Sequence, residues 1–459
     1  MQISKETYIR RRAQLKRDMG SGLLLFLGND EAAMNYADNT YRFRQDSTFL
    51  YFFGLDYAGL AAVIDVDNDR EIIFGNELTI DDIVWTGTMP SLRELAATVG
   101  ITNVRPMSEL ATIVKGKSVH FLPPYRGDHR VWLWELLGVE PAAQPAKASV
   151  PFIKAIVSQR NHKDEEELRL IEESVDLSTK MHLAAYRTVR PGIHESEVAA
   201  VVEEVACRPG GALAFPTIAT VQGQVLHNHG FIHDLKDGDI FLLDAGVETR
   251  SHYAGDLSSS MPVGERFTAR QAEVYEIHLR SFWAAVDKLQ LGRPFRDAHI
   301  AAATEIARGM KDLGLMKGDP AEAAEAGAYA LFFPCGLGHM MGLDVHDMEN
   351  LGEQYVGYAE GMQKSTQFGF KSLRLARPLE PGFVFTIEPG IYFIPELMDK
   401  WEAEGQFRDF ICYDRLGPWR NFTGLRNELN YVMTDKGSRL LGTIKKPMTI
   451  KEVYAAKSY

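Results

Sequence analysis

The run IFLLDAG at residues 240–246 is apolar up to Leu243 and then turns to a carboxylate, Asp244. Its length and composition predict a buried strand whose carboxylate lies just past the last hydrophobic layer. A desolvated carboxylate without a partner costs several kcal/mol, on the order of the stability margin of a whole domain. The run therefore predicts that Asp244 faces a cation or a strong set of hydrogen-bond donors.

Two more carboxylates stand at predicted strand ends. Asp256 follows Asp244 by twelve positions, a separation that suits a strand returning after a hairpin, so both acids are expected to face one cavity. In residues 383–390, FVFTIEPG, strand alternation puts Glu388 on the side opposite the three apolar residues at odd positions. Because Pro389 stops the strand, Glu388 is expected at its end.

A further predicted strand carries a polar face. In residues 425–431, LRNELNY, alternation places Arg426, Glu428 and Asn430 on one side and apolar side chains on the other. A polar face inside a strand indicates a functional site. Arg426 is expected either to orient neighbouring carboxylates as a hydrogen-bond donor or to form a plain ion pair.

These segments resemble the prolidase and aminopeptidase P family. The matching phrases, in family order, are LDAG at 243–246, GLGH at 336–339, GLDVHD at 342–347, TIEPG at 386–390 and GLRNE at 424–428. Residues 42–54, RFRQDSTFLYFFG, resemble the corresponding segment of the aminopeptidase P N-terminal domain, so the resemblance spans nearly the entire chain. It implies an α/β N-terminal domain followed by an α+β catalytic domain of the pita-bread (creatinase/aminopeptidase-like) fold.

The resemblance also implies a set of metal ligands, namely Asp244, Asp256, His339, Glu388 and Glu428. Asp244 is expected to bind one ion, His339 and Glu388 the other, while Asp256 and Glu428 bridge the pair. Any one of these residues alone is more typical of a structural acid or a core histidine, but five together predict a dinuclear site. Four carboxylates and one imidazole favour manganese, with zinc, cobalt or iron as alternatives. Two such ions activate water and polarise the scissile carbonyl.

Catalytic and substrate-binding residues follow from the same resemblance. Glu388 is expected to shuttle protons, with Arg426 orienting the carboxylates, while His227 and His346 bind substrate and stabilise the tetrahedral intermediate. Polar loop histidines that cap backbone groups are the alternative for both. Arg374 matches a prolidase arginine that binds the free terminal carboxylate of a dipeptide, and a surface arginine is its alternative.

One departure from the family concerns a side chain that faces the substrate. Cys335 stands where the family usually has histidine before Gly-Leu-Gly-His. The loss of that imidazole predicts altered turnover or substrate range. Leu429 replaces the acidic residue that commonly follows the bridging glutamate, and LSSS at 257–260 replaces a threonine-containing segment. Neither of these two changes removes a ligand.

Composition and charge narrow the class of protein. A hydrophobic content of 45% is typical of soluble globular proteins, and the longest apolar stretches fall far short of a membrane span. The net charge of −12 disfavours nucleic acid and anionic membranes as partners. No apolar segment of a signal peptide follows the basic cluster at residues 10–12. Three widely spaced cysteines fit free thiols in a reducing cytoplasm.

A chain of 459 residues predicts two domains. The N-terminal domain is expected at residues 1–157, with short apolar strands at 22–27, 61–65 and 71–74. The catalytic domain is expected at residues 158–459, and its first helix starts at the acids 164–167 and runs to about Val189. His194-Glu195 lacks the second histidine of a zincin motif and is expected near a helix start. Further helices are expected from 196, at 268–290 and at 297–313.

The sequence thus predicts a metallopeptidase that hydrolyses the bond preceding proline, most suited to Xaa-Pro dipeptides. Within this class the alternative is aminopeptidase P, which acts on longer peptides. Outside it, the alternative is a pseudo-peptidase that binds peptides without turnover, although such relatives usually lose metal ligands. Xaa-Pro peptides are the expected partners, and a homodimer is expected. Trp85 resembles an N-domain tryptophan that approaches a neighbouring subunit's active site, whereas an isolated aromatic is more often in the core.

Overall fold

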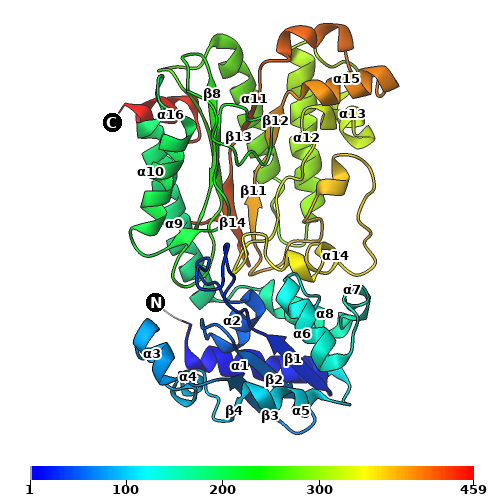
Figure 1. Cartoon of the computed structure of the whole chain (residues 1–459). Helices are drawn as coiled ribbons and strands as arrows, with labels where there is room; N and C mark the ends of the chain where they lie inside the picture. Colours follow the sequence, from blue (N-terminus) through cyan, green and yellow to red (C-terminus); the bar gives the residue numbers. More distant parts are fainter. Residues whose placement is uncertain (1–2, 459) are drawn as a thin grey trace. The chain divides into compact units, whose positions relative to one another are not determined.

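The computed structural model describes residues 3–458, which form two compact units. The first unit runs to Arg160 and also takes in Met348–Tyr355. The second comprises Asn161–Asp347 and the chain from Val356 onward. Figure 1 shows the elements of both. Over the described range 3–458, no helix has the length and apolar character that crossing a membrane requires.

The first unit is an α/β unit around one five-stranded sheet of order β4-β3-β2-β1-β5. The central strands β1, β2 and β3 are antiparallel neighbours, and β4 and β5 add in parallel at the edges. The strands are β1 (Leu23–Leu27), β2 (Ala61–Asp65), β3 (Arg70–Gly75), β4 (Val104–Pro106) and β5 (Val119–His120). The helices are α1 (Lys5–Met19), α2 (Ser47–Phe53), α3 (Ile80–Thr86), α4 (Leu92–Thr98), α5 (Leu110–Val114), α6 (Gly127–Leu137), α7 (Gln144–Lys147) and α8 (Val150–Arg160). The three strands predicted from apolar runs are confirmed to within one residue.

The second unit holds several short antiparallel ladders, of order β10-β8-β7, β11-β14-β15, β12-β13 and β6-β9. Its strands are β6 (Ala212–Leu213), β7 (Ile218–Thr220), β8 (Ile240–Ala245), β9 (Val247–Glu248), β10 (Leu257–Pro262), β11 (Val384–Ile387), β12 (Gly390–Tyr392), β13 (Gly424–Arg426), β14 (Leu429–Thr434) and β15 (Gly437–Leu440). Its helices are α9 (Glu165–Thr188), α10 (Glu195–Cys207), α11 (Ala269–Val286), α12 (Phe295–Asp312), α13 (Pro320–Ala326), α15 (Pro395–Glu404) and α16 (Ile450–Lys457), and α14 (Glu353–Val356) begins in the first unit.

Two helix pairs flank the strands of the second unit. α9 packs on α10 and against β8 and β10, whereas α11 packs on α12 and against β11 and β12. Figure 1 shows these pairs on opposite sides of the strands. The capping box of Asp164 and Glu167 begins α9 where the sequence predicts it, because its acids satisfy the first backbone N–H groups. α11 ends at Val286, four residues earlier than expected, because tight turns follow up to Gly292 with φ +75°.

The polar strand predicted at 425–431 is broken in two. β13 ends at Arg426 and β14 starts at Leu429, so Asn427 and Glu428 lie between them. Their partner strands β12 and β11 are interrupted at the matching place, Glu388 and Pro389. The register is nevertheless continuous, with Ile387 opposite Leu429 and Gly390 opposite Arg426. Glu388 therefore lies opposite Glu428, and directly opposed residues in an antiparallel pair point to the same face.

Candidate active site

All candidate site residues border one cavity of about 330 Å³ in the second unit. The predicted ligands around it are Asp244, Asp256, His339, Glu388 and Glu428, and the other predicted residues are His227, Cys335, His346, Arg374 and Arg426. These residues come from separate segments between His227 and Glu428, so the fold brings the predicted set together as a whole.

The two aspartates reach the cavity from the β8–β10 hairpin. Asp244 is the penultimate residue of β8 and stands opposite Ser258 of β10 in an antiparallel register. Asp256 lies two positions before Ser258, just outside the strand, and a spacing of two returns to the same face. The predicted returning strand is therefore confirmed, and it explains why both acids line one cavity.

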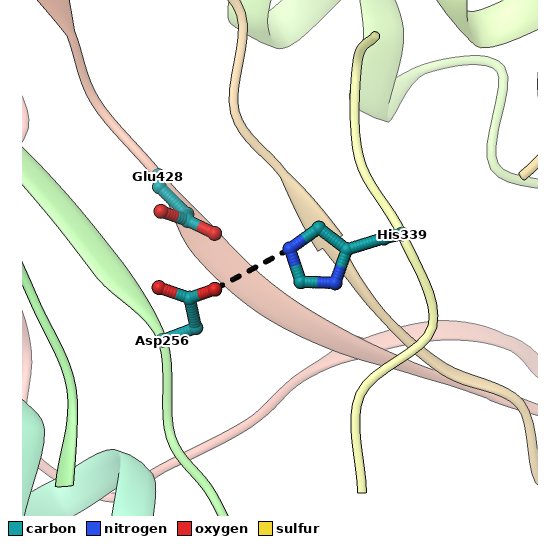
Figure 2. A group of neighbouring side chains, drawn as sticks. All are labelled: Asp256, His339 and Glu428. Atoms are coloured by element: carbon teal, nitrogen blue, oxygen red, sulfur yellow. Dashed lines mark ion pairs between the residues drawn. The ribbon is translucent and has the colours of Figure 1, made fainter. Parts of the chain in front are cut away.

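His339 is oriented by its own backbone surroundings. Its Nδ1 lies 3.0 Å from the carbonyl oxygen of Met340, and because a carbonyl only accepts, Nδ1 carries the hydrogen. The lone pair of Nε2 then faces two carboxylates, with Asp256 Oδ2 at 3.3 Å and Glu388 Oε1 at 3.4 Å. Figure 2 shows Asp256, Glu428 and His339 converging, and one donor atom from each lies within 4.8 Å of the others.

A layer of polar side chains holds the carboxylates. Arg426 donates through Nη2 to Asp244 Oδ2 at 2.5 Å, through Nη1 to the Tyr392 hydroxyl at 2.7 Å and through Nε to Ser258 Oγ at 2.8 Å. Ser258 Oγ in turn donates to Glu428 Oε2 at 2.9 Å. Within the described range 3–458, these contacts leave Asp244 Oδ1 and Glu428 Oε1 buried without a hydrogen-bond partner. A buried carboxylate oxygen in that position is costly when ionised, and a cation beside it would offset that cost.

The electrostatics of the cavity point the same way. Burial, then the nearby charge of Asp244, raises the pKa of Asp256 to about 8. Burial likewise raises the pKa of Glu388 and lifts that of Glu428 well above its ordinary value, with neighbouring carboxylates adding to the shift. Arg426 pairs with Asp244, so the other three carboxylates, when ionised, carry negative charge that this guanidinium does not compensate. The donor set and its two orphaned oxygens therefore fit divalent cations.

Three other predicted residues line the cavity. The His346 ring lies over the His339 ring, with 3.8 Å between their centroids. Burial and then the charge of Arg426 lower the pKa of His227, which favours the neutral imidazole. Burial and the nearby Glu388 charge raise the pKa of Cys335 to about 12, so that side chain presents a neutral thiol.

Some residues at the site were missed by the sequence reasoning. Tyr392 and Ser258 hold Arg426, and His229 lines the cavity two positions after His227. An apolar wall is formed by Phe215, Pro216, Ile218 and Leu226. Strand spacing could have indicated two of these residues. Tyr392 lies four positions after Glu388, and Ser258 lies two positions after Asp256, so an even spacing puts each on the same face as the carboxylate before it.

Of the two interpretations of Trp85, the one that put its side chain in the core is wrong. Its side chain is 86% exposed on α3, together with Ile80 and Val84.

Comparison with known protein families gives matches in both parts of the chain. The profile of metallopeptidase family M24 matches residues 169–435, and that of the aminopeptidase P N-terminal domain matches residues 8–121. The chain belongs to metallopeptidase family M24. The predicted family and fold class are thereby confirmed for both parts of the chain.

Named relatives of this M24 metallopeptidase cover nearly all of it. The rat Xaa-Pro dipeptidase is 31% identical over 446 residues, which is 95% of this chain and 88% of the relative. The human Xaa-Pro dipeptidase is 29% identical over 453 residues, with shares of 94% and 88%.

Solved structures agree on the fold. Zinc-substituted Escherichia coli aminopeptidase P in complex with product has a TM-score of 0.82 at 24% identity and covers 100% of this chain and 99% of that one. The Pseudomonas aeruginosa aminopeptidase PepP has a TM-score of 0.81 at 25% identity, with coverage of 100% and 98%.

Proposed function

We propose that this M24 metallopeptidase hydrolyses the peptide bond preceding proline and that its preferred substrates are Xaa-Pro dipeptides. The observation that carries the proposal is the convergence of four carboxylates and one imidazole on a single cavity bordered by Arg374. The names of the human and rat relatives, Xaa-Pro dipeptidases that match over more than nine-tenths of this chain, support the substrate class.

Two divalent ions are the proposed cofactor. Asp244 would hold one ion and His339 and Glu388 the other, while Asp256 and Glu428 would bridge them. Oxygen-rich donors support manganese, and zinc, cobalt or iron are the alternatives. When bound, such a pair supplies Lewis acidity toward water and toward the scissile carbonyl. The homodimeric state and the cytoplasmic location expected from the sequence stay predictions.

The chain's own residues would then handle protons and substrate. Glu388 would hold and release a proton at its carboxylate, whose Oε1 accepts a hydrogen bond from the Thr386 hydroxyl at 3.2 Å. His227 and His346 line the same cavity, and their ring N–H groups would donate to a developing negative charge. Arg426 keeps Asp244 in place through its contact with Oδ2.

Arg374 is the proposed reader of substrate length. A guanidinium is well suited to pair with the free carboxylate that follows proline in a dipeptide. A tripeptide places an amide at the same position, and the charge-assisted contact is lost. Aminopeptidase P activity on longer peptides is the runner-up, supported by the fold shared with the bacterial enzymes.

The test combines substrate length with metal content. Purified enzyme supplied with Mn²⁺ should hydrolyse Xaa-Pro dipeptides faster than Xaa-Pro-Xaa tripeptides and should bind two ions per chain. Glu428→Ala should lose at least one ion because its carboxylate serves both, whereas Glu452→Ala, which removes an acid at the start of α16, should keep two. Two bound ions in the Glu428→Ala variant would refute the ligand assignment. Two ions in the wild type without turnover of any Xaa-Pro peptide would favour the pseudo-peptidase instead.

A further inference from the structure

The antiparallel ladder that carries Glu388 and Glu428 is interrupted at those two residues. In this register, odd-numbered residues of one strand lie opposite odd-numbered residues of the other and form the hydrogen-bonded pairs. Phe393 N donates to Thr423 O, and Met433 N donates to Phe383 O, both at 2.8 Å. Pro389 and Asn427 occupy the next position of this kind. In a continuous ladder the Asn427 N–H would donate directly to the Pro389 carbonyl.

A histidine side chain occupies that position instead. His278 belongs to α11 and is fully buried. Its Nε2 lies 2.7 Å from the Pro389 carbonyl oxygen and 3.2 Å from the backbone nitrogen of Asn427. Because a carbonyl only accepts, the shorter contact places the hydrogen on Nε2. Nε2 then has no lone pair left to accept from the Asn427 N–H. The ring therefore replaces the ladder bond by a hydrogen bond to the Pro389 strand and a close contact with the Asn427 strand.

On either side of the ring, the backbone N–H groups of the two strands donate to other segments and not to each other. Glu388 N donates to Leu337 O at 2.8 Å, and Glu428 N donates to Ser258 O at 3.0 Å. Each strand is thus bonded to a different neighbour at the gap, and the imidazole lies between the two strands there. Pro389 directly follows Glu388, and Asn427 directly precedes Glu428, so the ring sits one residue from each carboxylate.

We propose that His278 is a positioning residue for the metal centre, whose imidazole fixes the separation of the two strands and thereby the spacing of the Glu388 and Glu428 carboxylates. The inference rests on the proposed two-metal function. Groups that orient metal ligands without touching the metal typically change metal affinity or activity by 10- to 100-fold when removed.

The chain offers a matched control. His299 on α12 is also fully buried, and its Nε2 lies 2.7 Å from the Tyr329 hydroxyl. Among the residues that the structure describes, neither its Nδ1 nor that of His278 has a hydrogen-bond partner. His299 is not among the residues that border the cavity. Replacing either histidine by leucine removes one buried imidazole and one hydrogen bond, but only one of the two changes touches the strands of the site.

The experiment is calorimetric titration of the metal-free protein with Mn²⁺ alone. The wild type should bind two ions, and His278→Leu should bind at least one of them about 10- to 100-fold more weakly. His278→Gln should recover most of the affinity, because the glutamine amide reaches the place of Nε2 and donates to Pro389. His299→Leu should bind both ions as the wild type does, even where its thermal stability falls as much as that of His278→Leu.

Each other outcome counts against the inference. Wild-type affinity in His278→Leu, an equal loss in His299→Leu, or no recovery in His278→Gln would each overturn it. Should the leucine variant fail to fold, His278→Asn takes its place, since its amide is too short to reach Pro389, and equal Mn²⁺ affinity of the asparagine and glutamine variants would overturn the inference. A wild type that binds neither Mn²⁺ nor Zn²⁺, Co²⁺ or Fe²⁺ would instead refute the proposed two-metal function.

Discussion

Arg374 is the residue on which substrate length depends. It borders the cavity together with the five proposed ligands. Buried charge-assisted hydrogen bonds contribute roughly 1.5 to 3 kcal/mol, which corresponds to about tenfold to a hundredfold in kcat/KM. Arg374→Ala should therefore lower kcat/KM on Xaa-Pro dipeptides by that factor and on Xaa-Pro-Xaa tripeptides much less. Arg377→Ala, which removes the arginine paired with Glu380 at 2.8 Å, should leave the ratio unchanged.

Two outcomes would contradict the role proposed for Arg374. Equal losses on dipeptides and tripeptides would show that the guanidinium does not contact the terminal carboxylate. A wild type that prefers tripeptides would move the assignment to aminopeptidase P.

Cys335 is the second residue with a measurable consequence. It offers the cavity a neutral thiol in place of the family's imidazole, because burial and Glu388 raise its pKa to about 12. A thiol is a weak hydrogen-bond donor, whereas an imidazole contributes on the order of tenfold to a thousandfold through proton transfer and charge stabilisation. Cys335→His should raise kcat/KM on Xaa-Pro substrates. Cys412→His, a half-buried cysteine elsewhere in the second unit, should not. No gain in the Cys335 variant on any Xaa-Pro peptide would show that the position serves another substrate.

Single residues were predictable where a carboxylate ended an apolar run. Asp244 and Glu388 were found in this way, because a charge that interrupts a buried strand needs a reason. Alternation also placed Arg426 on the face of Glu428, where it contacts Asp244. His278 could not be found from sequence, since a histidine among apolar helix positions looks like a core residue, and its contacts with Pro389 and Asn427 join segments more than a hundred positions away.

At the scale of elements, the break between β13 and β14 was not predicted. Alternation continues through Asn427 and Glu428, so the pattern indicates one strand, whereas tertiary contacts of the backbone interrupt it. The start of α10 was predicted near residue 196, and in the structure His194 caps a helix that begins at Glu195. The role of the next residue, Glu195, was not predicted, because it depends on contacts with a loop that lies more than twenty positions later in the chain.

Glu195 fixes the loop that carries His227 and His229. Its fully buried carboxylate accepts hydrogen bonds from the backbone N–H groups of Val221, Ile232 and His233, at 2.9 to 3.1 Å, and from the Thr220 hydroxyl at 2.9 Å. Both ends of the loop are therefore tied to one side chain at the start of α10.

Glu195→Gln should disturb this loop without touching the metal ligands. An amide nitrogen would face backbone donors, and each lost charge-assisted bond costs about 1.5 to 3 kcal/mol. We expect kcat/KM to fall by tenfold or more while two Mn²⁺ ions still bind. Asp176→Asn is the control, because that carboxylate likewise accepts backbone N–H groups, those of Thr443 and Ile444, but in a segment that does not border the cavity. Full activity in Glu195→Gln would show that the loop does not need this anchor.

At the scale of the whole molecule, three buried histidines make stability depend on acid. Burial is the main cause that lowers the pKa of His182 to about 3, of His278 to about 4 and of His299 to about 3. All three are fully buried. In the unfolded chain they titrate near 6.5, so the unfolded state binds more protons than the native state between pH 6.5 and about 4. Their contribution to stability is present above pH 6.5 and is lost as the pH falls through this window.

His299 is not among the residues that line the cavity, so its removal isolates its share of the pH dependence. For each proton bound only by the unfolded state, the free energy of unfolding falls by about 1.4 kcal/mol for every unit by which the pH is lowered within the window. His299→Leu should therefore reduce the slope of unfolding free energy against pH by about that amount between pH 6 and 4.5, whatever the carboxylates of the site contribute to both proteins. Urea unfolding of wild type and variant at three pH values in this range measures the difference. Parallel slopes would mean that His299 is protonated in the native state, in conflict with its full burial and its contact with the Tyr329 hydroxyl.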